Sequence, residues 1–177
     1  QHHHNATQGQ LPNVIYIMAD DLGIGDLGCY GQPTIKAPAI DSLATAGMLF
    51  TQHYSGSTVS APSRCALLTG KHTGRCYIRG NEGQMNGYDE GVYYDKALAQ
   101  GETTVADVMK QAGYTTACIG KWGLGGPYTE GHPNLHGFDY FFGYLGQARA
   151  HHYYPEYIWE NNERVVLDKE VYSHDLI

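Results

Sequence analysis

The sequence predicts an α/β fold in which a largely parallel sheet is flanked by helices, because strand-like and helix-like segments alternate along the chain. Residues 13–19 form a continuous β-prone apolar run, which is typical of a strand buried on both faces. Residues 37–46 repeat apolar side chains at helical spacing and end at Gly47, before a second β-prone run at 48–50. In such folds the functional residues collect at the carboxyl ends of the strands.

Two further helices and one further strand continue this alternation. Residues 60–69 favour a helix that Gly70 stops, and residues 104–113 begin with a capping box and end in glycine. The run 114–119 then predicts a strand that delivers Lys121 at its carboxyl end. The sequence therefore predicts repeated strand and helix units within one domain.

Composition narrows the class of protein. The chain has 177 residues, 42% of them hydrophobic and 16% charged, which is typical of one folded domain. A formal net charge of −7 argues against a nucleic-acid partner, and no apolar run approaches the ~20 residues of a membrane-spanning helix. We interpret residues 1–10, which include three consecutive histidines, as a leader or tag remnant, and residues 11–177 as the folded part.

Asp20 and Asp21 are candidate metal ligands at the end of the first predicted strand. Neighbouring side chains converge only where a strand breaks, and Gly23 and Gly25 favour such a break. Two carboxylates there suit calcium or magnesium, and the alternative is a pair of solvated turn residues.

The glycines at 23–28 also match a dinucleotide-binding fingerprint, with Asp41 close to the position of a ribose-binding acid. We reject this interpretation because Asp20, Asp21 and Asp26 would repel a pyrophosphate. Asp41 also falls within a helical pattern instead of ending a second strand.

A candidate anion site lies at the start of the helix predicted over residues 60–69. The free N–H groups and the dipole of a helix amino terminus attract an anion, and Arg64, four residues after Ser60, can lie over the same face. The alternative is that Ser60 is an ordinary N-cap and Arg64 is solvated.

Three segments together resemble the formylglycine-dependent, arylsulfatase-like sulfatases of the alkaline phosphatase superfamily. Residues 60–70 (S-A-P-S-R-C-A-L-L-T-G) resemble the serine type of the sulfatase signature, whose first residue is converted to formylglycine. Asp20 and Asp21 resemble the calcium-binding pair of the family. Residues 120–125 (G-K-W-G-L-G) resemble its G-K-W-H-L-G element, whose lysine contacts the sulfate.

The resemblance covers the chain from about residue 12 to its end and implies the amino-terminal part of a catalytic domain with an alkaline-phosphatase-like fold, incomplete in this chain. It implies release of inorganic sulfate by the hydrate of a formylglycine derived from Ser60, with one calcium ion bound by Asp20, Asp21 and position 60. Arg64 would orient the formylglycine, and Lys121 would offset charge during transfer. A formylglycine-generating maturation enzyme, a complementary carboxy-terminal segment of the same protein, and a periplasmic or secreted location after removal of a signal peptide are implied as well.

One departure from the family pattern concerns the catalytic base. Gly123 stands where many relatives have a histidine that helps to deprotonate the hydrate, so another residue must act in its place. His72, His151 and His152 are the candidates. Further metal ligands, a leaving-group histidine and a second sulfate-binding lysine are expected beyond Ile177.

The predicted substrate is a sulfated saccharide, with an aryl sulfate as a simpler equivalent. Residues 123–157 read as a long functional loop or cleft wall, and 147–157 combine Arg149 and His151 with rings that can stack on a sugar. A packed aromatic cluster is an equal alternative for the tyrosines. Further candidate substrate contacts are Arg79 and Asn81.

Two rival functions remain at this stage. One is hydrolysis of phosphate monoesters or diesters on the same fold, and the other is non-catalytic binding of sulfated glycans. The count of bound metal ions would separate the first from a sulfatase, and sulfate release would exclude the second.

Overall fold

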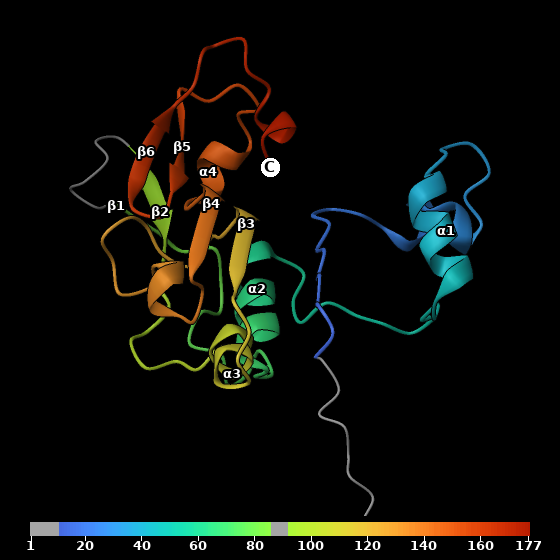
Figure 1. The fold of residues 1–177 in the computed structure, drawn as a ribbon, viewed down its shortest axis with the longest axis horizontal. Coiled ribbons are helices and arrows are strands. Elements are labelled where there is room, and N and C mark those ends of the chain that lie inside the picture. Colours follow the sequence, from blue (N-terminus) through green and yellow to red (C-terminus); the bar gives the residue numbers. More distant parts are fainter. Residues whose placement is uncertain (1–10, 86–91) are drawn as a thin grey trace, which may run out of the picture. The chain divides into compact units, whose positions relative to one another are not determined.

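The computed structural model of this chain describes residues 11–85 and 92–177, and divides them into two compact units (Figure 1). The first unit ends at Gln52 and the second runs from His53 to Ile177. Of the helices in the described residues, none combines the length and the apolar character that a membrane crossing needs.

The first unit is built from short helices. It contains α1 (Pro38–Ala46) and two 3-10 helices, η1 (Ile24–Asp26) and η2 (Gly28–Tyr30). Helix α1 matches the predicted helix, because Pro38 occupies its first turn and Gly47 follows its last residue.

The strands predicted at 13–19 and 48–50 are absent from the described part of the first unit. Val14, Ile15 and Ile17 are largely exposed, with fractional exposures of 62%, 86% and 80%. An apolar, β-prone run becomes a strand only when a neighbouring strand satisfies its backbone groups. The described residues of this unit contain no strand that could serve as that neighbour.

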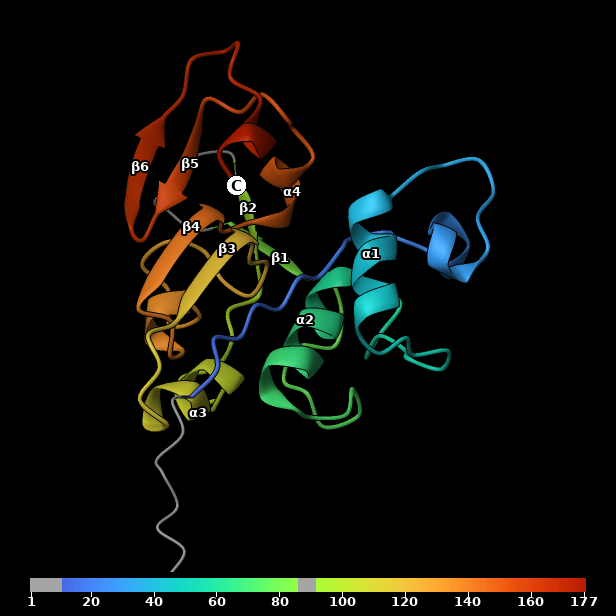
Figure 2. The same cartoon turned by 45° about the vertical axis from the view of Figure 1, so that its right-hand side comes forward.

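The second unit is organised around a four-stranded sheet in the order β3-β4-β5-β6 (Figure 2). Strands β3 and β4 are parallel, with Lys121 opposite Tyr144, whereas β4 and β5, and β5 and β6, are antiparallel. The α/β class is correct, but the sheet is not largely parallel, since only one of these three pairs is parallel. The β5–β6 pair is antiparallel because a tight hairpin around Asn161 joins the two strands. The bounds are β3 (Ala117–Lys121), β4 (Tyr140–Tyr144), β5 (Tyr157–Glu160) and β6 (Glu163–Val166).

Strand β3 begins later than predicted and includes Lys121. The backbone N–H of Thr116 donates to Oδ2 of Asp139 at 2.9 Å, and the Thr116 hydroxyl donates to the carbonyl of Gly137 at 2.5 Å. These bonds occupy polar groups of the chain just ahead of the sheet ladder. The predicted start at Tyr114 is therefore wrong, while the placement of Lys121 at the carboxyl end is correct.

Helices flank the sheet where capping signals predict them. Helix α2 (Ser60–Thr69) is followed by Gly70 in a left-handed conformation, and α3 (Val105–Gln111) begins with the predicted capping box. The remaining elements are the hairpin of β1 (Gly83–Met85) and β2 (Tyr93–Asp95), the short helix α4 (Gln147–Ala150), and the 3-10 helices η3 (Pro133–Leu135) and η4 (Ser173–Asp175).

The interpretation of residues 123–157 as one long loop is wrong, because this segment contains β4, η3 and α4. Gly143 in the middle of β4 allows its strand to approach β3 closely, since an added Cβ would collide with the Gly120 carbonyl. Abundant glycine and tyrosine are common to loops and to closely packed strands, so composition did not distinguish the two.

A buried histidine lies beside the core of the second unit. His132 is 1% exposed, its Nδ1 accepts a hydrogen bond from the N–H of Asn134, and its Nε2 faces the carbonyl of Asn161 at 3.1 Å. This pattern fits the neutral ring with its proton on Nε2. Burial lowers the pKa of His132 below the ordinary value of 6.5, because a charged ring would lose its hydration.

We therefore expect acid to destabilise the fold through His132. The unfolded chain takes up a proton near the ordinary pKa and the folded chain does so only at lower pH, so the stability is present above about pH 6.5 and declines as the pH falls below it. Measured by chemical denaturation, the free energy of unfolding of His132→Gln should fall less steeply between about pH 7 and about pH 5 than that of the unchanged protein. His152→Gln, at an exposed histidine, is the matched control, and equal slopes for all three proteins would contradict the prediction.

Candidate active site

Ser60 is the first residue of α2, and Arg64 lies over it on the same helical face. The Nε of Arg64 donates to the Ser60 hydroxyl at 2.9 Å. Val59 is the N-cap residue and is extended, so Ser60 is not the ordinary N-cap that we considered as an alternative. The start of α2 thus presents one hydroxyl and one guanidinium together.

Arg64 also joins this helix to the sheet. Its Nη1 donates to the backbone carbonyl of Lys121 at 2.6 Å, at the carboxyl end of β3. The Nζ of Lys121 lies 3.5 Å from Oε1 of Gln147. The structure therefore brings Ser60, Arg64 and Lys121 together from segments that lie far apart in the sequence.

Asn81 supports the amino end of α2. Its Oδ1 accepts a hydrogen bond from the N–H of Ala61 at 2.9 Å, and a second one from Nε2 of Gln147 at 3.3 Å. The free N–H groups at a helix start need such partners. Asn81 thus acts on the helix that carries Ser60, in addition to any contact with a substrate.

Sequence reasoning missed Asp95 and Gln147. The Oδ1 of Asp95 accepts from Nε2 of Gln147 at 2.6 Å, and its Oδ2 accepts from the Gln147 backbone N–H at 3.0 Å. Burial raises the pKa of Asp95, although these hydrogen bonds act in the opposite direction. The sequence feature that could have identified Gln147 is its position just after β4. This feature could be used only if β4 had been predicted as a strand.

Gly123 lies against the same side chains. Its φ of 70° is left-handed, and a Cβ built on it would lie 3.0 Å from Cγ of Gln147 and 3.7 Å from Cδ of Arg64. A larger residue in this position would therefore need a shift of Gln147. The space next to the Gly123 backbone is taken by Gln147 and Arg64.

The thiol of Cys118, a half-buried residue, is not a competing nucleophile. Burial raises the pKa of Cys118 on β3 to about 12, although the charge of Arg64 favours the thiolate. Only a thiolate is strongly nucleophilic, and this thiol stays protonated at neutral pH. Cys118 therefore does not compete with the Ser60 hydroxyl at neutral pH.

The predicted substrate contacts lie on the surface. Arg79 and His151 are both exposed, and His151 ends the short helix that Gln147 begins. Arg149 instead places its guanidinium 4.2 Å from the ring centre of Tyr157, so it packs against the sheet. The candidate bases His72 and His152 are exposed too.

The tyrosines after α4 form a cluster on the surface. Tyr153 and Tyr154 contact the ring of Tyr172, at 6.1 Å and 5.6 Å between ring centres, and His174 stacks on Tyr172 at 5.2 Å. Tyr153 and Tyr154 remain 50% and 59% exposed. They therefore pack against other rings, as one alternative predicted, and keep exposed surface that a sugar ring can contact.

Asp20 and Asp21 belong to the first unit, whose position relative to the second is not determined. Asp21 has a φ of 56°, so the chain turns at the pair itself and not first at the glycines that follow. No cluster of three or more His, Cys, Asp and Glu side chains suited to a metal ion occurs in the described residues. The predicted meeting of these carboxylates with Ser60 stays a prediction.

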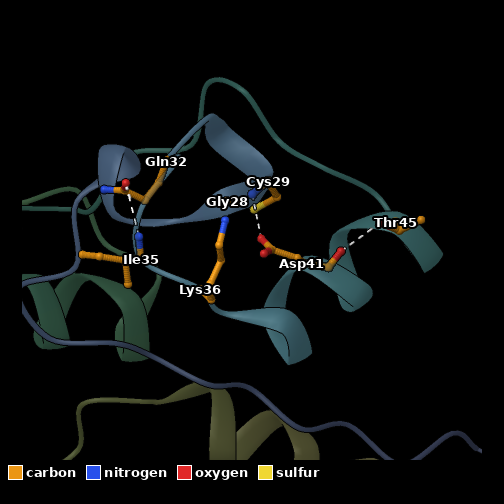
Figure 3. Close-up of a pocket in the computed structure, with 7 residues that line it drawn as sticks. All are labelled: Gly28, Cys29, Gln32, Ile35, Lys36, Asp41 and Thr45. Carbon is orange, nitrogen blue, oxygen red and sulfur yellow. Dashed lines mark hydrogen bonds between the residues drawn. The ribbon is translucent and has the colours of Figure 1, made fainter.

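The glycine-rich segment after the aspartates does not have the strand-loop-helix form of a dinucleotide site. It forms η1 and η2 instead, and Asp41 of α1 accepts the N–H of Cys29 at 2.6 Å (Figure 3). A pocket of about 350 Å³ lies beside this bond, lined by Gly28, Cys29, Gln32, Ile35, Lys36, Asp41 and Thr45. Asp41 therefore ties η2 to α1, in agreement with our rejection of a ribose-binding role.

The chain is similar to known proteins over most of its length. The family model described as Sulfatase matches residues 12–177. The chain is 46% identical over 147 residues to an N-acetylgalactosamine-6-O-sulfatase of Bacteroides thetaiotaomicron, covering 78% of this chain and 27% of that protein. It is 44% identical over 142 residues to the arylsulfatase D of Homo sapiens, covering 75% of this chain and 23% of that protein.

Solved structures show the same fold. A structure described under the metabolism of multiple glycosaminoglycans by Bacteroides thetaiotaomicron matches with a TM-score of 0.72 and 39% identity, over 89% of this chain and 32% of that one. A second, described as a complex with its substrate D-glucosamine-2-N,6-O-disulfate, matches with a TM-score of 0.70 and 29% identity, over 94% of this chain and 29% of that one. The chain spans about a quarter of the length of these two curated relatives. By the extent of the family match and by these relatives, the chain belongs to the sulfatase family.

Proposed function

We propose that the protein to which this chain belongs hydrolyses sulfate esters of carbohydrates, using a formylglycine derived from Ser60. The observation that carries the proposal is the contact of the Arg64 guanidinium with both the Ser60 hydroxyl and the carbonyl of Lys121. This contact places a hydroxyl and a guanidinium at a helix amino terminus, beside the strand end that carries the lysine. Such a site suits an anion whose negative charge increases during transfer.

The residues of this chain divide the work in the proposed reaction. Arg64 holds the side chain at position 60 by its Nε, and Lys121 offers an ammonium to the sulfate oxygens. The aldehyde hydrate of formylglycine supplies a nucleophile that can release sulfate again, whereas a serine sulfate ester would be a stable end product. A formylglycine-generating enzyme is therefore part of the proposal.

Two measurements test the proposal. The mass of the peptide that bears position 60 should be lower than that of the serine form by two hydrogen atoms, and the mature protein should release inorganic sulfate from a 6-O-sulfated N-acetylhexosamine. The names of the similar bacterial proteins support an amino-sugar substrate. An unmodified serine together with no sulfate release from sugar or aryl sulfates would refute the proposal.

Calcium is proposed as the metal of the site. Asp20 and Asp21 are hard oxygen donors at a chain turn, which suits a calcium ion better than a soft metal. When bound, calcium would neutralise sulfate charge and help to position the nucleophile. Its further ligands would come from position 60, from water and from other parts of the protein, and a periplasmic or secreted location would supply the ion.

We expect Asp21→Asn to weaken calcium binding by about tenfold or more, because the change removes one negative charge from a hard-cation site. Isothermal titration of the metal-free protein with calcium would measure this directly, and the thermal stabilisation by calcium should shrink in parallel. Asp168→Asn removes the same charge at an exposed site of the second unit and is the control. Equal calcium affinity in all three proteins would show that the aspartate pair is not the metal site.

A further inference from the structure

We propose that Gln147, oriented by Asp95, is a positioning residue that holds the ammonium of Lys121 in place at the active site. The inference rests on the proposed function, because it concerns how the same site is held in shape. It adds two residues that the sulfatase motifs in this sequence do not include.

The orientation of the Gln147 amide follows from its partners. Its Nε2 has two N–H donors, and the two acceptors beside it are Oδ1 of Asp95 at 2.6 Å and Oδ1 of Asn81 at 3.3 Å. The Asn81 oxygen is identified as an acceptor because it also receives the N–H of Ala61. With both donors used, Oε1 is the atom that faces Nζ of Lys121.

Asp95 fixes the position of Gln147 by two hydrogen bonds. One carboxylate oxygen accepts the side-chain N–H of Gln147 and the other accepts its backbone N–H. A side chain held at both ends loses most of its rotamer freedom, so its oxygen has a defined place. The left-handed Gly123 leaves the room that this side chain occupies.

The long side chain of Lys121 samples many rotamers unless other groups restrain it. An acceptor at 3.5 Å restrains its ammonium near the start of α2. A misplacement of about 1 Å costs a factor of about 100 in rate in well-organised sites, so loss of this restraint should appear in kcat more than in KM.

The isosteric variant Gln147→Glu provides the sharpest test. Charged groups beside position 147 in the described residues include Asp95 from β2, Lys121 from β3 and Arg64 from α2. While the introduced carboxyl group is protonated, it can donate to Asp95 and accept from Lys121, but it lacks the second N–H that the glutamine amide donates to Asn81. When the pH is high enough for both carboxyl groups, at positions 95 and 147, to lose their protons, the two negative charges repel each other. The hydrogen bond between these two side chains is then lost.

We expect the ratio of the variant's kcat to that of the unchanged protein, measured with an aryl sulfate, to be near unity at low pH and to fall about tenfold as the pH rises. Gln147→Ala should lose about tenfold in kcat at every pH, with KM changed by less than about twofold. Asp95→Asn should behave like Gln147→Ala, because both carboxylate oxygens of Asp95 accept N–H groups of Gln147. The amide NH₂ of an asparagine would face one of these N–H donors and could not accept it. Gln100→Ala and Asp168→Asn, at exposed positions, are the matched controls and should leave kcat unchanged.

A readout without turnover separates this inference from the proposed function. The rate of Lys121 acetylation by acetic anhydride, measured by mass spectrometry against Lys110, should rise about twofold or more in Gln147→Ala, because its ammonium loses the acceptor at position 147. If the unchanged protein releases no sulfate but this rise is seen, the proposed function fails and the positioning contact stands. An unchanged acetylation rate in Gln147→Ala, or a pH-independent kcat ratio in Gln147→Glu, overturns the inference.

Discussion

Ser60→Ala should abolish sulfate release, lowering kcat to the background of the assay. Alanine has neither the hydroxyl that Arg64 contacts nor a group that can become an aldehyde, so no covalent route remains. Removing the nucleophile of comparable enzymes costs about 10⁶ in kcat, although binding of the substrate can survive. Sulfate release and substrate affinity should therefore be measured on the same preparation.

The fold should tolerate this change. Ser60 makes no N-cap bond, and alanine is a good helix former in the first turn of α2. Ser42→Ala, at an exposed position of α1 outside the signature at 60–70, is the control that should retain activity. Turnover by Ser60→Ala at more than about one hundredth of the normal rate would exclude Ser60 as the source of the nucleophile.

Lys121→Ala should lower kcat by about a hundredfold to a thousandfold, because its ammonium acts on charge that grows in the transition state. Arg64 binds the backbone carbonyl at position 121, so its contact survives loss of the lysine side chain. The change should therefore leave the melting temperature close to normal. Lys110→Ala, on the exposed side of α3, controls for loss of a lysine that has its own ion pair with Asp139 at 2.7 Å.

Measuring both kcat and the melting temperature separates a catalytic role of Lys121 from a structural one. Unchanged kcat together with a lowered melting temperature would show that Lys121 serves stability alone. A large rise in KM with normal kcat would instead assign it to binding of the ground state.

The helices and the contact between Ser60 and Arg64 followed from local signals in the sequence. The glycine stops, the capping box of Thr104 and the helical spacing of Arg64 after Ser60 are all settled within a few residues. For that reason α1, α2 and α3 lie close to the predicted bounds. The position of Lys121 followed from its place directly after an apolar run.

The features that could not be predicted from the sequence depend on contacts between distant segments. Strand β4 reads as a loop in the sequence, and only its register against β3 shows why Gly143 is required. The link from Asp95 to Gln147 spans 52 positions and has no local pattern that could announce it. The apolar run at 13–19 is the opposite case, in which a strong local signal predicted a strand that is absent. It forms no strand because it has no neighbouring strand to pair with.

The four-residue helix α4 is too short to be stable by itself, and its N-cap residue Gly146 has no side chain to offer. Asp95 of β2 supplies the missing cap from another strand, and so helps to set the direction of the chain through His151 and Tyr153. We therefore expect substitutions at exposed residues after α4 to leave the position of Ser60 unchanged.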